Sequence, residues 1–129
     1  MFAVFLHQIK GLLTMLEHSE ENGVSVVNFQ HARILDEATV QSLGSELVEA
    51  GARAKSGKLL LNFSNVLLMS SAMIGKLVVL RNRCKKNGIQ LAFCGITSNV
   101  AEVFKIMKIN ELVEIYSDQA SALTAMQEV

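Results

Sequence analysis

The chain has 129 residues, of which 50% are apolar, and its 12 basic and 12 acidic side chains give a net charge of zero. This length and apolar content suffice for one domain with a filled core. They exclude an intrinsically disordered chain, which is poor in apolar residues and rich in net charge. Because the net charge is zero, the composition also gives no sign of a basic surface that would bind nucleic acid or an anionic membrane.

Residues 1–13 are apolar with loose helical spacing, and we predict a short helix that packs on the domain or on a second copy of it. The apolar side chains that share this spacing are Phe2, Phe5, Leu6, Ile9, Leu12 and Leu13. No basic residue precedes the apolar run, and His7 interrupts it, which argues against a signal peptide. No stretch is long enough to cross a bilayer. Residues 14–129 are expected to form the domain.

Two cysteines, Cys84 and Cys94, are too few for a disulfide framework. Each falls in a segment that is expected to be a helix or a strand, where a free cysteine behaves as a small apolar residue. A reducing cytoplasm is therefore the predicted location.

Residues 14–29 predict two short strands around a turn at Glu21-Asn22-Gly23, because Asn-Gly favours the positive φ values of a tight hairpin. Residues 36–57 predict a helix. Asp36 stands at the N-cap position, apolar residues follow at helical spacing, and Gly57 is the expected stop.

Residues 58–63 predict a short apolar strand of the kind that is covered on both faces. The apolar run continues to Met69. A second helix is predicted from Ser70 or Ser71 to Asn87, because its basic last turn and its Asn-Gly ending suit the helix dipole and a left-handed cap.

The remaining chain continues the alternation of strands and helices. Residues 89–96 predict a strand, residues 97–109 a helix, residues 111–116 a short strand, and residues 117–129 a helix capped by Ser117 or Asp118. Such alternation indicates βαβ units with right-handed crossovers and a sheet that is at least partly parallel. The predicted fold class is one compact α/β domain.

The usual signatures of catalysis and cofactor binding are missing from the sequence. The three histidines are scattered and no CxxC pair exists, so a zinc site has no support. Gly75-Lys76 lacks the upstream glycine and the following Ser/Thr of a phosphate-binding loop. Ser70 and Ser71 lack the flanking glycines of a nucleophile elbow. We therefore expect no catalytic residue, no cofactor and no metal.

The serine pair Ser70-Ser71 allows two interpretations. A serine before a helix is most often a cap, which stabilises by about 1 kcal/mol. The same position is an exposed strand-to-helix corner that another protein can reach. Phosphorylation there would add roughly −1.5 to −2 charges. The helix dipole would tolerate this charge, whereas a partner with an apolar or acidic docking surface would not.

The segment "KLLLNFSNVLLMSSAMIGKLVVLRNRCKKNGIQLAFCGITSNVAEVFKIMKINELVEIYSD" (58–118) resembles the STAS domains of bacterial anti-sigma factor antagonists. Three features carry the resemblance, which extends over roughly residues 14–127. A strand ending in Asn-Phe-Ser-Asn-Val leads to the Ser-Ser corner, a helix ending in Lys-Lys-Asn-Gly precedes an apolar strand, and a helix and short strand follow.

This resemblance implies a mixed sheet of four to five strands flanked by about four helices, with the apolar N-terminal segment as an addition. It also implies a regulatory, non-enzymatic role in transcription by partner switching. The unphosphorylated domain binds an anti-sigma factor that is often also a serine-protein kinase, and the phosphorylated domain releases it. Ser70 matches the phosphate acceptor of the family, and Ser71 is the second choice.

The resemblance also suggests a partner-binding surface around the corner. Its candidate residues are Asp36, Met69, Ser70, Ser71, Ala72, Met73 and Lys76. Met69 replaces the acidic residue of the family motif, and Ala72 and Ile74 replace its glycines. Met69 and Met73 are expected to be packing or corner surface in the first place, and the alternative for Met73 is an exposed contact point, because methionine surfaces adapt to partners. Asp36 is expected to be a cap and Lys76 a solvated helix residue in the first place.

Two alternative functions stay open. Met69 and the apolar N-terminal segment favour a STAS scaffold or sensor that is never phosphorylated and assembles with itself or with other STAS proteins. A small-ligand or nucleotide-binding domain has the support of family analogy alone.

Overall fold

A computed structural model describes residues 15–127, so the predicted N-terminal helix and the last two residues lie outside the described part of the chain. The elements in chain order are β1 (Leu16–Glu21), β2 (Val24–Phe29), β3 (Arg33–Ile34), α2 (Glu37–Ala52), β4 (Lys58–Asn62), β5 (Leu68–Met69), α3 (Ser71–Lys86), β6 (Gln90–Cys94), α4 (Ser98–Ile106), η1 (Ile109–Glu111), β7 (Glu114–Tyr116) and α5 (Gln119–Gln127). Within residues 15–127, none of the helices has the length and apolar character of a membrane span.

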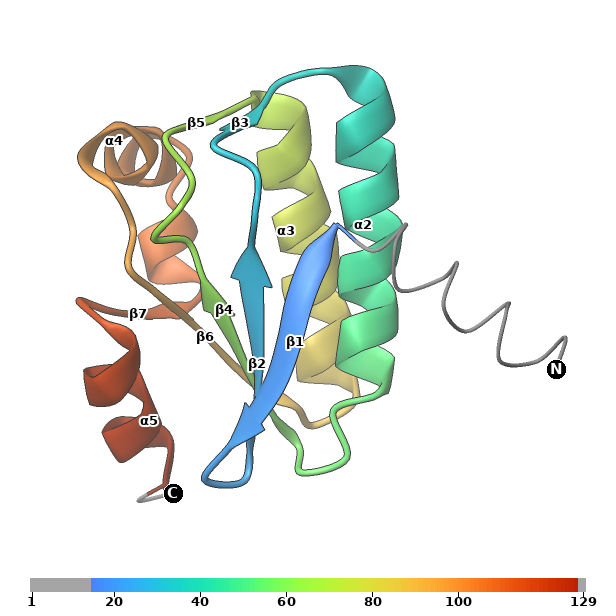
Figure 1. The fold of residues 1–129 in the computed structure, drawn as a ribbon, viewed down its shortest axis with the longest axis vertical. Helices are drawn as coiled ribbons and strands as arrows, with labels where there is room; N and C mark the ends of the chain where they lie inside the picture. The colour runs from blue at the N-terminus through green and yellow to red at the C-terminus, as the bar shows by residue number, and fades with distance from the viewer. Residues whose placement is uncertain (1–14, 128–129) are drawn as a thin grey trace, which may run out of the picture.

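Five strands form one mixed sheet in the order β1-β2-β4-β6-β7. β1 pairs antiparallel with β2, and the other neighbours pair in parallel. Figure 1 shows α2 and α3 side by side over one face of this sheet, with α5 on the other side. The predicted mixed sheet with four flanking helices is confirmed.

The hairpin between β1 and β2 forms where the sequence predicts it. Asn22 has φ 54° and Gly23 has φ 78°, the two positive values that a tight two-residue turn requires. Leu16 pairs with Phe29 at the far end of the hairpin. The turn residues therefore set the register of the first strand.

β4 is the central strand, and its apolar run is buried on both faces as predicted. Leu59 and Leu61 belong to the core under α2 and α3, whereas Leu60 packs with the α5 residues on the opposite face. All three leucines are fully buried. Because neighbouring leucines of β4 point to opposite faces of the sheet, this strand contributes to both cores of the domain.

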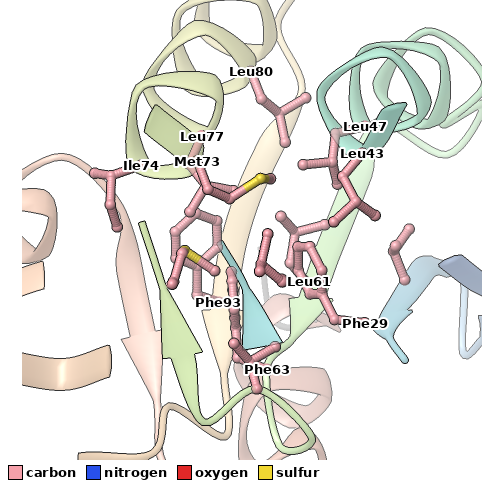
Figure 2. Packing of buried hydrophobic residues seen from close by; sticks show 14 of the residues in the cluster. Phe29, Leu43, Leu47, Leu61, Phe63, Met73, Ile74, Leu77, Leu80 and Phe93 are labelled. Atoms are coloured by element: carbon pink, nitrogen blue, oxygen red, sulfur yellow. The ribbon is translucent and has the colours of Figure 1, made fainter. Parts of the chain in front are cut away.

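Four phenylalanines form an aromatic cluster in the larger core, and Figure 2 labels Phe29, Phe63 and Phe93 among them. The Phe63 ring stacks on Phe29, with centroids 4.6 Å apart, and lies 4.9 Å from the Phe93 ring. Phe104 of α4 meets Phe63 edge-on at 5.7 Å. These offset and edge-to-face arrangements are the favourable ones for aromatic rings, and they fasten α4 to the sheet.

Several boundaries differ from the sequence prediction. α2 ends at Ala52 rather than near Gly57, because the Arg53 amide caps it and a turn then leads into β4. Gly57, with φ 76°, belongs to that turn. α4 ends at Ile106, and η1 follows it. The small parallel sheet of β3 and β5 was not predicted either.

Candidate partner-binding corner

A two-residue parallel sheet builds the corner that carries the serine pair. Ile34 of β3 pairs with Met69 of β5, and the Ser70 amide donates to the Ile34 carbonyl oxygen at 2.9 Å. Because the carboxyl ends of parallel strands meet at one edge, α2 and α3 begin next to each other there (Figure 1). We call the residues at these two helix starts, Asp36 and 70–72, the corner.

Ser70 is the N-cap of α3. Its backbone is extended, with φ −77° and ψ 159°, and its Oγ accepts a hydrogen bond from the Met73 amide at 3.3 Å. The residue is half-buried, and Ser71 and Ala72 beside it are exposed. The first turn of α3 carries no acidic side chain. The local field at this hydroxyl therefore favours added negative charge.

Asp36 caps α2 as predicted. Its Oδ2 accepts from the Thr39 amide at 3.0 Å and from the Thr39 hydroxyl at 2.9 Å. The backbone bond from Thr39 lowers the pKa of Asp36 most, the hydroxyl bond lowers it further, and His31 adds a smaller electrostatic effect. An ionised carboxylate thus stands at the start of one helix, at the same edge of the small sheet as the Ser70 hydroxyl.

The alternative that Met73 is an exposed contact point is wrong. Met73 is 0% exposed, because it shares the core-facing side of α3 with Leu77 and Leu80 (Figure 2). Met69 is also buried, at 7%, on the inner side of β5. Neither methionine presents its side chain as a docking surface. A methionine in place of the acidic residue of the family motif suits this apolar environment.

Lys76 lies between the two helices rather than in open solvent. Its aliphatic carbons cross α2 at Gly44, where an added Cβ would lie 2.8 Å from Lys76 Cδ. Its Nζ donates to Gln41 Oε1 at 3.1 Å. Lys76 therefore joins α3 to α2, and the absent side chain of Gly44 makes room for it.

Two exposed leucines flank the corner and were not among the predicted site residues. Leu35 follows β3 and is 48% exposed, and Leu67 precedes β5 and is 53% exposed. The Leu67 amide bonds the Ala32 carbonyl at 2.7 Å, which holds this loop against the start of β3. No sequence signal distinguishes Leu67, because it stands within an apolar run that is otherwise mostly buried.

The cysteines have no catalytic character. Both are free and buried. Burial, with a smaller effect from Asp118, raises the pKa of Cys94 to about 11, and burial also raises the pKa of Cys84. Among residues 15–127, no cluster of three or more His, Cys, Asp or Glu side chains could hold a metal ion.

Comparisons with known proteins converge on one family. The model of the STAS domain family matches residues 10–122. No curated protein matches the chain.

Three solved structures illustrate the likeness. An anti-sigma-factor antagonist (STAS) domain protein from Planctomyces limnophilus is 29% identical, with a TM-score of 0.76, 86% of this chain covered and 96% of that chain. A putative anti-sigma factor antagonist from Thermotoga maritima is 17% identical, with a TM-score of 0.73 and 86% and 93% covered. The anti-sigma factor antagonist SpoIIAA, in its unphosphorylated form, is 12% identical, with a TM-score of 0.71 and 88% and 97% covered.

Proposed function

The chain belongs to the STAS domain family, and from that membership we propose that it is an anti-sigma factor antagonist controlled by phosphorylation of Ser70. In the unphosphorylated state it binds an anti-sigma factor in the cytoplasm and thereby frees a sigma factor. The partner is itself a serine-protein kinase, and the phosphate that it adds to Ser70 ends the complex. The antagonist catalyses nothing and needs no cofactor in this role.

The position of Ser70 is the observation that carries the proposal. Its hydroxyl caps α3, the residue is half-buried, and the next two residues are exposed. A phosphate at this helix start would meet amide N–H groups and the positive end of the helix dipole. The domain would therefore keep its fold, and the cost of the new charge would arise in the interface. A buried charge without a partner costs roughly 2–5 kcal/mol at such a contact.

The similar proteins support the same role. The protein from Planctomyces limnophilus is described as an anti-sigma factor antagonist, and SpoIIAA is known in an unphosphorylated and a phosphorylated form. Both cover most of this chain. We transfer to this chain the class of partner and the control by phosphate.

The corner also supplies groups that a partner can recognise. Asp36 offers an exposed, ionised carboxylate, and Leu35 and Leu67 offer exposed apolar side chains on either side. Because residue 69 is a methionine, and a buried one, the kinase finds no acidic residue directly before the acceptor. We propose that Asp36 provides the negative charge that the family motif places beside the serine.

The test is the affinity of the purified protein for the anti-sigma factors of its own genome. We expect Ser70→Ala to bind as wild type and Ser70→Asp to bind at least about thirtyfold more weakly, as an unpaired interface charge requires. Ser45→Asp, on the exposed side of α2, adds the same charge outside the corner and should have no effect. Equal affinities of Ser70→Asp and wild type would refute the switch, and weakening by Ser71→Asp alone would assign it to Ser71.

A second candidate function is a self-assembling STAS scaffold that is never phosphorylated. Exposed apolar side chains occur in the segment from the end of α4 to the edge strand β7, where Ile106 is 79% exposed and Met107, Leu112 and Ile115 are also exposed. Sedimentation of the full chain and of residues 14–129 tests this candidate. A monomer in both cases rejects it, and an oligomer that requires residues 1–13 supports it.

A further inference from the structure

The outer face of α3 is a surface that no other described element covers. It consists of Ser71, Ala72, Gly75, Val79, Asn82 and Lys86, which are all exposed and recur three or four positions apart from Ala72 onward. The opposite side of the helix is buried against the core. The face begins directly beside Ser70 and runs for the length of the helix, which is about 24 Å for 16 residues.

The first half of this face is open and lacks large side chains. A Cβ added to Gly75 would meet nothing within 4 Å, so the packing of the domain does not require a glycine there. A glycine inside a helix costs about 1 kcal/mol relative to alanine. Val79 follows it one turn later and is 45% exposed. This half lets a partner come close to the backbone of α3.

The second half of the face carries Lys86 and is bordered by Arg83 and Lys85, and we call it the basic half. Arg83, Lys85 and Lys86 occupy the last turn and are exposed, and α3 contains no acidic residue. Within residues 15–127, an ion pair joins Glu49 of α2 to Arg53, the C-cap residue of that helix. Arg83, Lys85 and Lys86 have no carboxylate partner in this part of the chain. The helix dipole favours such cations, and the adjoining open face places them where a partner can pair with them.

We propose that the anti-sigma factor docks along the outer face of α3 and presents an acidic protein surface to it. The carboxylates of the partner lie opposite Arg83 and Lys86, and its backbone or small side chains lie over Gly75. This inference rests on the proposed function and adds the chemistry of the partner. It also agrees with the direction of the switch, because a phosphate on Ser70 places an unpaired charge at one end of the interface, away from the cations of the face.

The length of the face agrees with a protein partner. The outer face runs about 24 Å along α3, and the exposed Leu35 and Leu67 flank the corner at which it begins. A polyanion such as RNA, or an anionic membrane, would use the cations without using Gly75 and Val79.

Two variants and two matched controls test the docking surface. Gly75→Leu fills the open half and Lys86→Glu reverses a charge in the basic half. Ser45→Leu places the same bulk on the exposed side of α2, and Lys105→Glu reverses a cation in the last turn of α4. Each protein is titrated with the immobilised anti-sigma factors of the same genome, with RNA and with phosphatidylserine vesicles at low and high salt. Its melting temperature is measured in parallel.

We expect Gly75→Leu to lower the affinity at least about tenfold, as a clash at an interface centre does, without lowering the melting temperature. We expect Lys86→Glu to slow association and weaken its salt dependence, because rim charges act on the rate of encounter. Both controls should bind as wild type.

Other outcomes overturn the inference in distinguishable ways. If both variants bind normally while Ser70→Asp does not, the docking surface is refuted and the proposed function stands. If the wild type binds none of the anti-sigma factors, the proposed function falls and the inference falls with it. If Lys86→Glu instead abolishes binding to RNA or to phosphatidylserine vesicles, the ligand of the basic half is not a protein.

Discussion

The backbone amide of Ser70 donates a hydrogen bond to the carbonyl oxygen of Ile34, and the two atoms are 2.9 Å apart. This bond extends the pairing of β3 with β5 by one residue. It fixes the start of α3 relative to the strand that leads into α2, so the positive ends of two helix dipoles lie together. We therefore expect a charge on Ser70 to change what the protein binds and to leave its fold intact.

The first consequence concerns the stability of two Ser70 variants. Ser70→Ala removes the side chain that accepts from the Met73 amide, and we expect a loss of about 1 kcal/mol in the free energy of unfolding. Ser70→Asp keeps a good N-cap at the positive end of a helix and should stay within about 0.5 kcal/mol of wild type. Urea unfolding measures both. An Asp variant less stable than the Ala variant would show that the corner does not tolerate negative charge.

The Asp36 cap predicts a pH dependence. Hydrogen bonds from Thr39 lower the pKa of Asp36 in the folded protein. The carboxylate therefore stabilises the fold at pH values above its unfolded pKa of about 3.9, and this contribution is lost as the pH falls through the folded pKa. Wild type should be more stable than Asp36→Ala at pH 7, and the difference should shrink below about pH 4. Thermal unfolding across this range measures it, and a constant difference would contradict the assignment.

A comparison of alanine variants at Gly95 and Gly23 distinguishes backbone strain from steric overlap. Both have positive φ, 68° and 78°, but a Cβ at Gly95 would overlap Ser64 Oγ, whereas a Cβ at Gly23 would meet nothing. Gly23→Ala should cost about 1–2 kcal/mol for the left-handed backbone alone. Gly95→Ala should cost a further 1–3 kcal/mol or so for overpacking. Adding Ser64→Ala should recover part of that loss, and equal costs at both glycines would contradict the assigned clash.

The buried thiols should be unreactive in the native protein. The pKa of Cys94 is raised to about 11, and the thiolate is the reactive form of cysteine. At pH 8 we expect a thiol reagent to modify neither Cys84 nor Cys94 in the folded state, and both in denaturant. Mass measurement after a short exposure counts the labels. Rapid labelling of the native protein would show that the Cys94 region opens locally.

Much of the fold could be predicted because its signals are local. The Asn22-Gly23 turn, the Asp36 and Ser70 caps and the leucine run of β4 each depend on a few neighbouring residues. The small β3–β5 sheet could not be predicted in the same way. Two-residue strands show no periodicity, and this sheet depends on pairing residues 35 positions apart along the chain, such as Ile34 with Met69.

In the corner, the helix caps could be predicted from the sequence, but the exposure of the residues beside them could not. Ser70 and Asp36 stand at helix starts, where the sequence marks them, and the structure confirms both caps. The side-chain exposure of their neighbours depends on tertiary packing. Met73 turns toward α2 and the core, whereas Leu35 and Leu67 remain exposed, although all three are apolar residues near the corner. The helical spacing of Met73 with Leu77 and Leu80 was the signal that could have placed it inside.

The phosphorylation state of Ser70 in the cells that make this protein is the most direct test of the account. Tandem mass spectrometry that localises modified residues should find phosphate on Ser70 in part of the population. Protein recovered in complex with an anti-sigma factor should carry none at this position. Absence of phosphate from Ser70 under every growth condition, or a Ser70-phosphorylated chain that stays in the complex, would contradict the switch.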